Sequence, residues 1–211
     1  MADDWKEPAD ALEKDLGLPE GFLEGLRNED DWSFIIKIHA LMEASVSYLL
    51  LRHFEDERLG AIFDFLELSD KRKGKIAFVS ALDLLPIECR RFLSKLSEIR
   101  NTLVHNIKNV GFDLSSFVRG LNKDQFEVFV NSCVSIDLND IDFGKNNERR
   151  KEWIASNAKW FIYRFALITM TLIYRKGETA VLNRRLREEA VKKLSAFIEL
   201  SESDNADGGA T

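Results

Sequence analysis

The feature that most constrains the fold is how rarely helix breakers interrupt the chain. Its 211 residues contain three prolines, at positions 8, 19 and 86, and eleven glycines. Proline ends or kinks a helix because it lacks the backbone donor, and each of these three stands where it can start a helix instead. The composition, 45% hydrophobic and 31% charged, is that of a globular protein. The sequence therefore predicts an all-α fold, an up-and-down bundle with long central helices.

Apolar residues at three- and four-residue spacings indicate where the helices lie. Asp30 or Asp31 is a natural N-cap for the first strong helix, Pro86 opens another, and Gly177 is expected to end the long buried helix that starts at Asn147. The pattern over 109–144 is mixed, helical at 123–133 and alternating at 134–138. We predict three parts: a short N-terminal helical arm at 1–29, a helical domain at 30–200, and a disordered C-terminal tail at 201–211.

Charge and cysteine content narrow the function classes. A net charge of −6 argues against a broad nucleic-acid-binding surface, while local basic patches remain available. Cys89 and Cys133 are far apart and have no histidine cluster, which argues against a zinc site and indicates buried thiols in a reducing cytoplasm. The longest uncharged apolar run, 165–174, is too short to span a bilayer. We expect a cytoplasmic protein with no metal, no cofactor and no membrane association.

Two polar residues interrupt the apolar stripe of the helix over 30–54. His39 and Glu43 lie one turn apart among residues that face the core. A carboxylate directed at a core is costly unless a positive charge meets it. We interpret the two residues either as a structural ion pair or as support for a nearby site.

A short basic run forms a second candidate. Gly74 interrupts it, and a glycine there would let another backbone or a phosphate approach closely. A solvated helix end is the alternative. We expect Asp70 to cap a helix that includes this run, and the candidate phosphate contacts are Lys71, Arg72, Lys73 and Lys75.

The cluster of reactive side chains that stands out is Arg100, Asn101 and His105, late in the helix that Pro86 opens. On a wheel of about 100° per residue, Arg100 falls within the buried arc and His105 lies ~140° away on the opposite side. Arg100 needs a carboxylate near the core, and Glu43 is our first candidate. One straight helix cannot bring Arg100 and His105 to the same substrate atom, so the helix ends near the motif or two chains build the site.

In its helical context, this spacing resembles the Arg-x(4–6)-His motif of the HEPN superfamily. The stretches 42–50, 74–85 and 96–106 together look like its mannitol-operon-repressor-like branch, and the likeness covers roughly residues 30–180. Ile107 stands where the toxin-type motif has a tyrosine. The repressor-like branch is not generally a nuclease.

The resemblance implies a homodimer in which two motifs face each other across a cleft. In catalytic members this composite site cleaves RNA without a metal. By that analogy His105 would transfer protons, Arg100 would hold the scissile phosphate, and Asn101 would orient the substrate. The alternative is a non-catalytic transcriptional regulator or protein-interaction scaffold with a regulatory protein partner, in which Arg100 pairs with Glu43 to join two helices.

Overall fold

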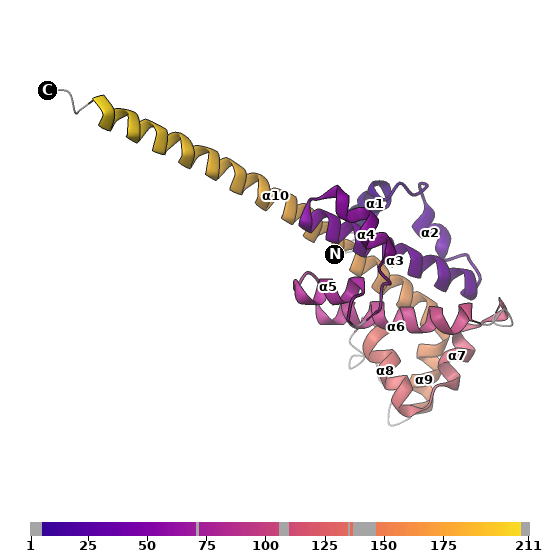
Figure 1. Ribbon diagram of the computed structural model, residues 1–211. Coiled ribbons are helices and arrows are strands. Elements are labelled where there is room, and N and C mark those ends of the chain that lie inside the picture. Colours follow the sequence, from indigo (N-terminus) through magenta and orange to yellow (C-terminus); the bar gives the residue numbers. More distant parts are fainter. Residues whose placement is uncertain (1–5, 71, 106–109, 135, 137–146, 208–211) are drawn as a thin grey trace.

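The computed structural model describes residues 6–70, 72–105, 110–134, 136 and 147–207. Over these residues the chain forms helices and no strand, which confirms the predicted all-α bundle. Most of the helices make one body, and the last one projects from it (Figure 1). In chain order the elements are α1 (Lys6–Asp15), α2 (Phe22–Leu26), α3 (Asp31–Phe54), the 3-10 turn η1 (Glu57–Leu59), α4 (Gly60–Phe65), α5 (Lys75–Ala81), α6 (Ile87–Val104), α7 (Leu114–Gly120), α8 (Lys123–Cys133), α9 (Asn147–Ser156) and α10 (Ala158–Asp207).

Side-chain caps set several of the helix starts. Asp30 accepts a hydrogen bond from the backbone N–H of Ser33 at 3.0 Å and starts α3 where the sequence predicts it. Asp113 caps α7 in the same way. Asn122 and Gln125 form a reciprocal capping box at the start of α8. These caps satisfy amide groups that would otherwise have no partner in the first turn.

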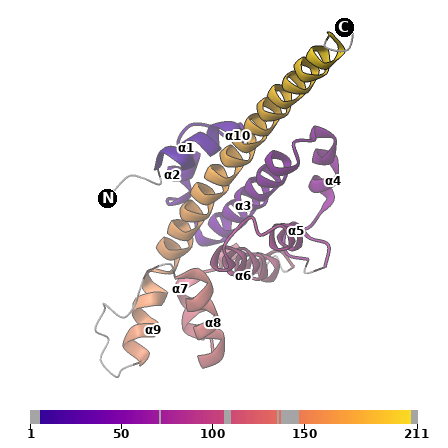
Figure 2. The same ribbon diagram turned by 90° about the vertical axis from the view of Figure 1, so that its left-hand side faces the viewer.

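The core is centred on α3, α6 and α10. Figure 2 shows α10 between α1 on one side and α3 on the other, with α8 and α9 at the end opposite its free tip. Phe92 of α6 stacks on Phe165 of α10 with ring centroids 4.8 Å apart. Four helices each contribute one fully buried phenylalanine: Phe34 from α3, Phe92 from α6, Phe129 from α8 and Phe161 from α10.

The N-terminal arm is two short helices that pack against the body. Leu12 of α1 and Leu26 of α2 are both buried. The Tyr48 hydroxyl of α3 donates to Asp15 Oδ2 at 2.8 Å, which ties the end of α1 to α3.

Three predicted helix boundaries differ from the structure. The helix expected to contain the whole basic run begins only at Lys75, and Asp70 instead accepts from the amides of Arg72 and Lys73 in the preceding turn. The long helix is interrupted at Asn157 and not at Gly177, so α9 and α10 are separate. Helix α10 continues to Asp207, past the predicted start of the tail. Most of the alternating stretch at 134–138 lies outside the described residues.

By length and composition, α3 could cross a membrane. It is also a core helix, and 61% of its most apolar window is buried inside the protein. A mostly buried core helix can have the length and hydropathy of a membrane span, so these two properties of α3 are weak evidence for a span.

Candidate functional site

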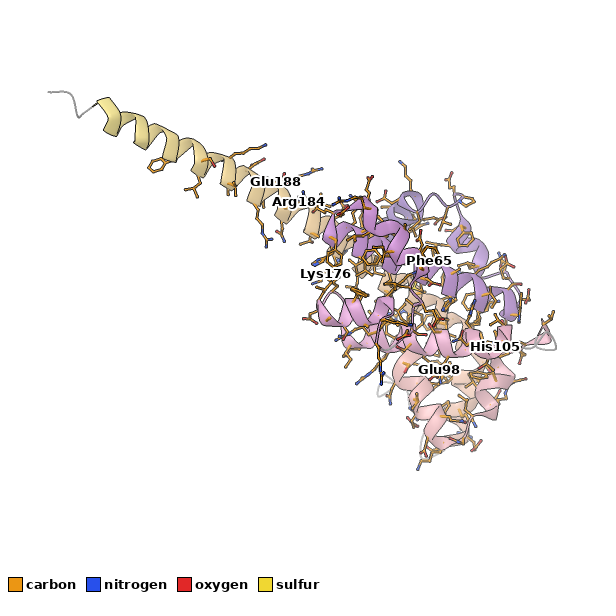
Figure 3. All side chains as sticks on the ribbon, in the orientation of Figure 1. Phe65, Glu98, His105, Lys176, Arg184 and Glu188 are labelled. Carbon is orange, nitrogen blue, oxygen red and sulfur yellow. The ribbon has the colours of Figure 1, made fainter. Side chains whose placement is uncertain are left out.

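The end of α6 presents the predicted motif to the surface. Asn101 and His105 are exposed, and Arg100 is half-buried. His105 is the C-cap of α6, so the helix ends at the motif, as one of the two sequence alternatives required. Figure 3 shows Glu98 and His105 on α6, with His105 at the end of that helix farther from the projecting part of α10.

The structure gives Glu43 a different partner from the one we predicted. Lys75 Nζ lies 2.9 Å from Glu43 Oε1, and the Lys75 side chain is only 4% exposed. The predicted pairing of Arg100 with Glu43 is therefore wrong. The physical reason is that α5 packs on α3, and Lys75 in its first turn reaches the Glu43 carboxylate.

Arg100 makes a local contact instead. Its Nη1 donates to Asn101 Oδ1 at 3.1 Å. Among the residues that the structure describes, no carboxylate forms an ion pair with this guanidinium. The positive charge of Arg100 is thus not neutralised within the described part of the chain.

His39 does not form the predicted ion pair with Glu43 but bonds to α6. His39 Nε2 lies 3.1 Å from Ser97 Oγ, and Ser97 Oγ donates to the Leu93 carbonyl at 2.9 Å. Because the Ser97 hydroxyl proton is used in that bond, Ser97 accepts from Nε2–H of His39. This arrangement fixes the neutral ring on its Nε2–H tautomer.

These contacts form a polar cluster behind the motif, called here the buried polar cluster, in which His39, Lys75 and Ser97 are buried and Glu43 is half-buried. Burial lowers the pKa of His39, and the positive charges of Arg100 and Lys75 lower it further, while Glu43 acts in the opposite direction. The cluster joins α3, α5 and α6 just inside the exposed motif.

The basic run contributes less to a site than its sequence suggests. Lys75 is buried and paired with Glu43, so its assignment as a phosphate contact is wrong. Arg72 and Lys73 are exposed. Lys71 lies outside the described residues. Gly74 meets a backbone and not a ligand: a Cβ there would lie 2.6 Å from Asp70 N, Asp70 O and Glu67 O.

No group that could hold a metal is present among the described His, Cys, Asp and Glu residues. Cys89 and Cys133 are both buried and free, as the sequence predicted for small hydrophobes. Burial raises the pKa of the Cys133 thiol to about 12. A thiol with that pKa is protonated and poorly nucleophilic at neutral pH.

Two members of the cluster were missed or misassigned from the sequence. Ser97 lies one turn before Arg100 on the inward side of α6, and its small hydroxyl among apolar neighbours was the available signal. Lys75 follows Gly74 directly, and the close backbone approach at that glycine places Lys75 at the start of a buried helix turn.

The protein is all-α, and the end of α6 places the half-buried Arg100 guanidinium beside the exposed Asn101 and His105 side chains. A guanidinium, an amide and an imidazole can bind an anion such as a phosphate, and the exposed imidazole can also exchange protons. No protein-family model, no curated protein and no solved structure matches the chain.

The lowered pKa of His39 predicts how stability depends on pH. Unfolded His39 takes up a proton as the pH falls below about 6.5, whereas folded His39 stays neutral until a lower pH. The contribution of His39 to the free energy of unfolding is therefore complete above about pH 6.5. It decreases as the pH falls from that value to the lower pKa of folded His39, by at most about 1.4 kcal/mol per pH unit.

Urea unfolding of the wild type and of His39→Gln at neutral and mildly acidic pH measures this effect. Gln keeps a donor near the Nε2 position and does not titrate. We expect the wild type to lose more stability than the variant on acidification. Equal losses for the two proteins would show that His39 is not held neutral by the fold.

Proposed function

We propose that this chain is a HEPN-like helical protein whose Arg100, Asn101 and His105 form an RNA-directed phosphate-binding site. Arg100 holds a phosphate, Asn101 orients its guanidinium, and His105 lies beside the bound backbone. Cleavage without a metal would need a second copy, because Arg100 and His105 leave α6 in different directions. We propose further that such a protein acts in the cytoplasm.

One observation supports this proposal above the others. Lys75 neutralises Glu43, and Arg100 remains half-buried with Asn101 as its hydrogen-bond partner and no described carboxylate in ion-pair reach. A partly desolvated guanidinium without a counter-ion attracts an anion more strongly than a solvated one. Its planar donors match two oxygens of a phosphate.

The chain does not offer a broad basic surface for RNA. Its net charge is −6, so binding depends on local contacts at the motif and not on long-range attraction. Single-stranded RNA fits this requirement, because a short stretch of backbone can reach a small site and its bases can turn away. A duplex would bring more phosphates against an acidic body.

The test is RNA affinity of Arg100→Ala compared with the wild type. We expect about tenfold weaker binding of single-stranded RNA, since a hydrogen bond to a charged group contributes roughly 1.5–3 kcal/mol. Arg58→Ala is the matched control, because it removes the same charge from a side chain that is 89% exposed on η1, away from α6. Equal affinities for the two variants would contradict the proposed site.

Cleavage is measured separately, with mixed RNA in the presence of a chelator. Loss of cleavage in His105→Ala, with binding retained, would assign proton transfer to His105. Wild-type protein that binds RNA and cleaves none of it would restrict the site to binding.

A second function is favoured by a different observation. The projecting part of α10 exposes large apolar side chains, Leu182, Leu186, Leu194 and Phe197 among them. Exposed apolar stripes of this kind mark interaction surfaces. We propose on this ground the alternative of a non-catalytic regulator or protein-interaction scaffold, in which the buried polar cluster has a structural role.

A further inference from the structure

An open groove lies on the surface between α5, α6 and α8, and it is not part of the motif at the end of α6. Its volume is about 440 Å³, within the range of sites that bind small molecules. Helices α5 and α8 both pack beside α6, so three helices form its walls (Figure 2). The basic residues that line the groove are Arg90, Arg91 and Lys95. This local positive charge lies on a chain whose net charge is −6.

Neither arginine of the groove has a counter-ion among the described residues. Arg90 Nη1 donates to Ser80 Oγ at 2.5 Å, and Arg90 Nε is shielded from water without a hydrogen-bond partner. Arg91 is exposed, and it forms no hydrogen bond or ion pair with the described part of the chain. A partly desolvated guanidinium without a carboxylate attracts an anion more strongly than a solvated one. Arg90 is therefore suited to hold an anionic group.

The hydrogen bond between Arg90 and Ser80 holds donors in place on two helices. Ser80 is on α5 and Arg90 is on α6, and both line the groove. Because Ser80 Oγ accepts from Arg90, the Ser80 hydroxyl proton is available for a ligand. Ser94 differs, since its hydroxyl donates to the Arg90 carbonyl at 2.9 Å. Donors that are already positioned favour binding because less conformational freedom is lost when the ligand arrives.

The charges in the groove favour a ligand with two negative charges. Lys95 pairs with Glu98 at 2.7 Å, and Glu98 is the one acidic residue among the described residues that line the groove. Arg90 and Arg91 therefore leave two positive charges unbalanced. A phosphate monoester carries about −1.5 to −2 charges at pH 7 and has three acceptor oxygens, and a planar guanidinium binds two such oxygens at once. A carboxylate or a phosphodiester would neutralise only one of the two charges.

We propose that this groove binds a phosphate monoester attached to an apolar or aromatic body. The phosphate lies at Arg90, Arg91 and Ser80. The body lies against the apolar side chains of the lining, which become less exposed to water when it binds: Ile76, Ile87 and Val128. Ile87 and Val128 are 48% and 52% exposed without a ligand. A free small molecule and the phosphorylated end of an RNA chain both offer this chemistry.

Binding in this groove does not depend on the proposed RNA site. Arg91 and Arg100 lie about 14 Å apart along α6 and ~180° apart on a helical wheel. The two sites can therefore fail independently of each other. Arg100→Ala is expected to keep the affinity for a phosphate monoester, and Arg91→Ala is expected to keep the affinity for RNA that has no terminal phosphate.

The experiment is calorimetric titration of the full chain with adenosine monophosphate, cyclic adenosine monophosphate and adenosine, which share one body and differ in charge. The wild type is expected to bind the monoester more tightly than the cyclic diester, and adenosine most weakly. Arg91→Ala is expected to weaken binding of the monoester about tenfold, the effect of one lost hydrogen bond to a charged group. Arg187→Ala is the matched control, because it removes the same charge from an exposed side chain on α10. It is expected to leave the affinity unchanged.

A short oligoribonucleotide with and without a terminal phosphate distinguishes the two sources of the monoester. If the phosphorylated form binds more tightly than adenosine monophosphate and Arg91→Ala weakens it, the ligand is the end of an RNA chain. If it binds no more tightly, the ligand is a free monoester. A wild type that does not bind the monoester, or equal affinities of Arg91→Ala and Arg187→Ala, overturns the proposal. Equal affinities of the wild type for the monoester and the cyclic diester overturn the selection of a doubly charged ligand.

Discussion

Glu43→Gln is expected to destabilise the protein by about 3 kcal/mol, the low end for a buried ion pair that loses one partner. The reason is Lys75, whose side chain is 4% exposed and whose ammonium lies 2.9 Å from the Glu43 carboxylate. Without that carboxylate the fold must bury an unpaired ammonium or deprotonate it. For a chain of this length the loss corresponds to a melting temperature lower by roughly 6–12 °C, which calorimetry or thermal circular dichroism measures.

Lys75→Met shows which member of the Glu43–Lys75 ion pair causes the loss of stability. Lys75→Met removes the buried charge and keeps the aliphatic stem, and it leaves a Glu43 side chain that is 32% exposed and can be solvated. We expect Lys75→Met to cost about 1 kcal/mol, well below Glu43→Gln.

Arg100→Ala is also expected to change stability by less than about 1 kcal/mol, since Arg100 bonds only to exposed Asn101 among the described groups. A larger loss from Arg100→Ala than from Glu43→Gln would restore the pairing that the sequence predicted.

Helix positions could be predicted where the signal is local. Asp30 caps the helix that the sequence assigned to it, because an N-cap depends on a few consecutive residues. Gly177 was predicted to end a helix and does not. A Cβ at Gly177 would lie 3.2 Å from Tyr48 Cε1, so the glycine lets α10 pass close to α3. The packing of two helices outweighs a local preference of about 1 kcal/mol.

The site was predicted less completely, because periodicity gives the face of a residue and not its neighbour. Both Arg100 and Lys75 could have met Glu43. The choice depends on how the turn before α5 folds back on α3, and no spacing within one helix contains that information. His39 was correctly placed inside the core, yet its partner Ser97 comes from a helix far away in the sequence. Exposure of His105 followed directly from the wheel.

Gly74→Ala is expected to destabilise the protein by about 3 kcal/mol, the upper end for overpacking a site that cannot relax. A Cβ at this position would lie 2.6 Å from three backbone atoms, Asp70 N, Asp70 O and Glu67 O. Those atoms cannot rotate away as a side chain can. The amides of Lys75 and Ile76 also donate to the carbonyls of Glu67 and Leu68, at 3.0 Å each, so the start of α5 is fixed to the same segment.

The loss of stability in Gly74→Ala should exceed the loss from steric crowding alone, because moving α5 also moves Lys75 away from Glu43. Combined with Glu43→Gln, Gly74→Ala is therefore expected to cost less than the sum of the two single effects, since each disturbs the same ion pair. Gly177→Ala is the matched control. Its new methyl group would meet the Tyr48 and Arg52 side chains at 3.2–3.5 Å, and the gain in helix propensity of about 1 kcal/mol offsets the small shift required. Urea unfolding of the three single variants and of the double variant measures these differences. Strictly additive losses for Gly74→Ala and Glu43→Gln would show that the turn at Gly74 does not position Lys75.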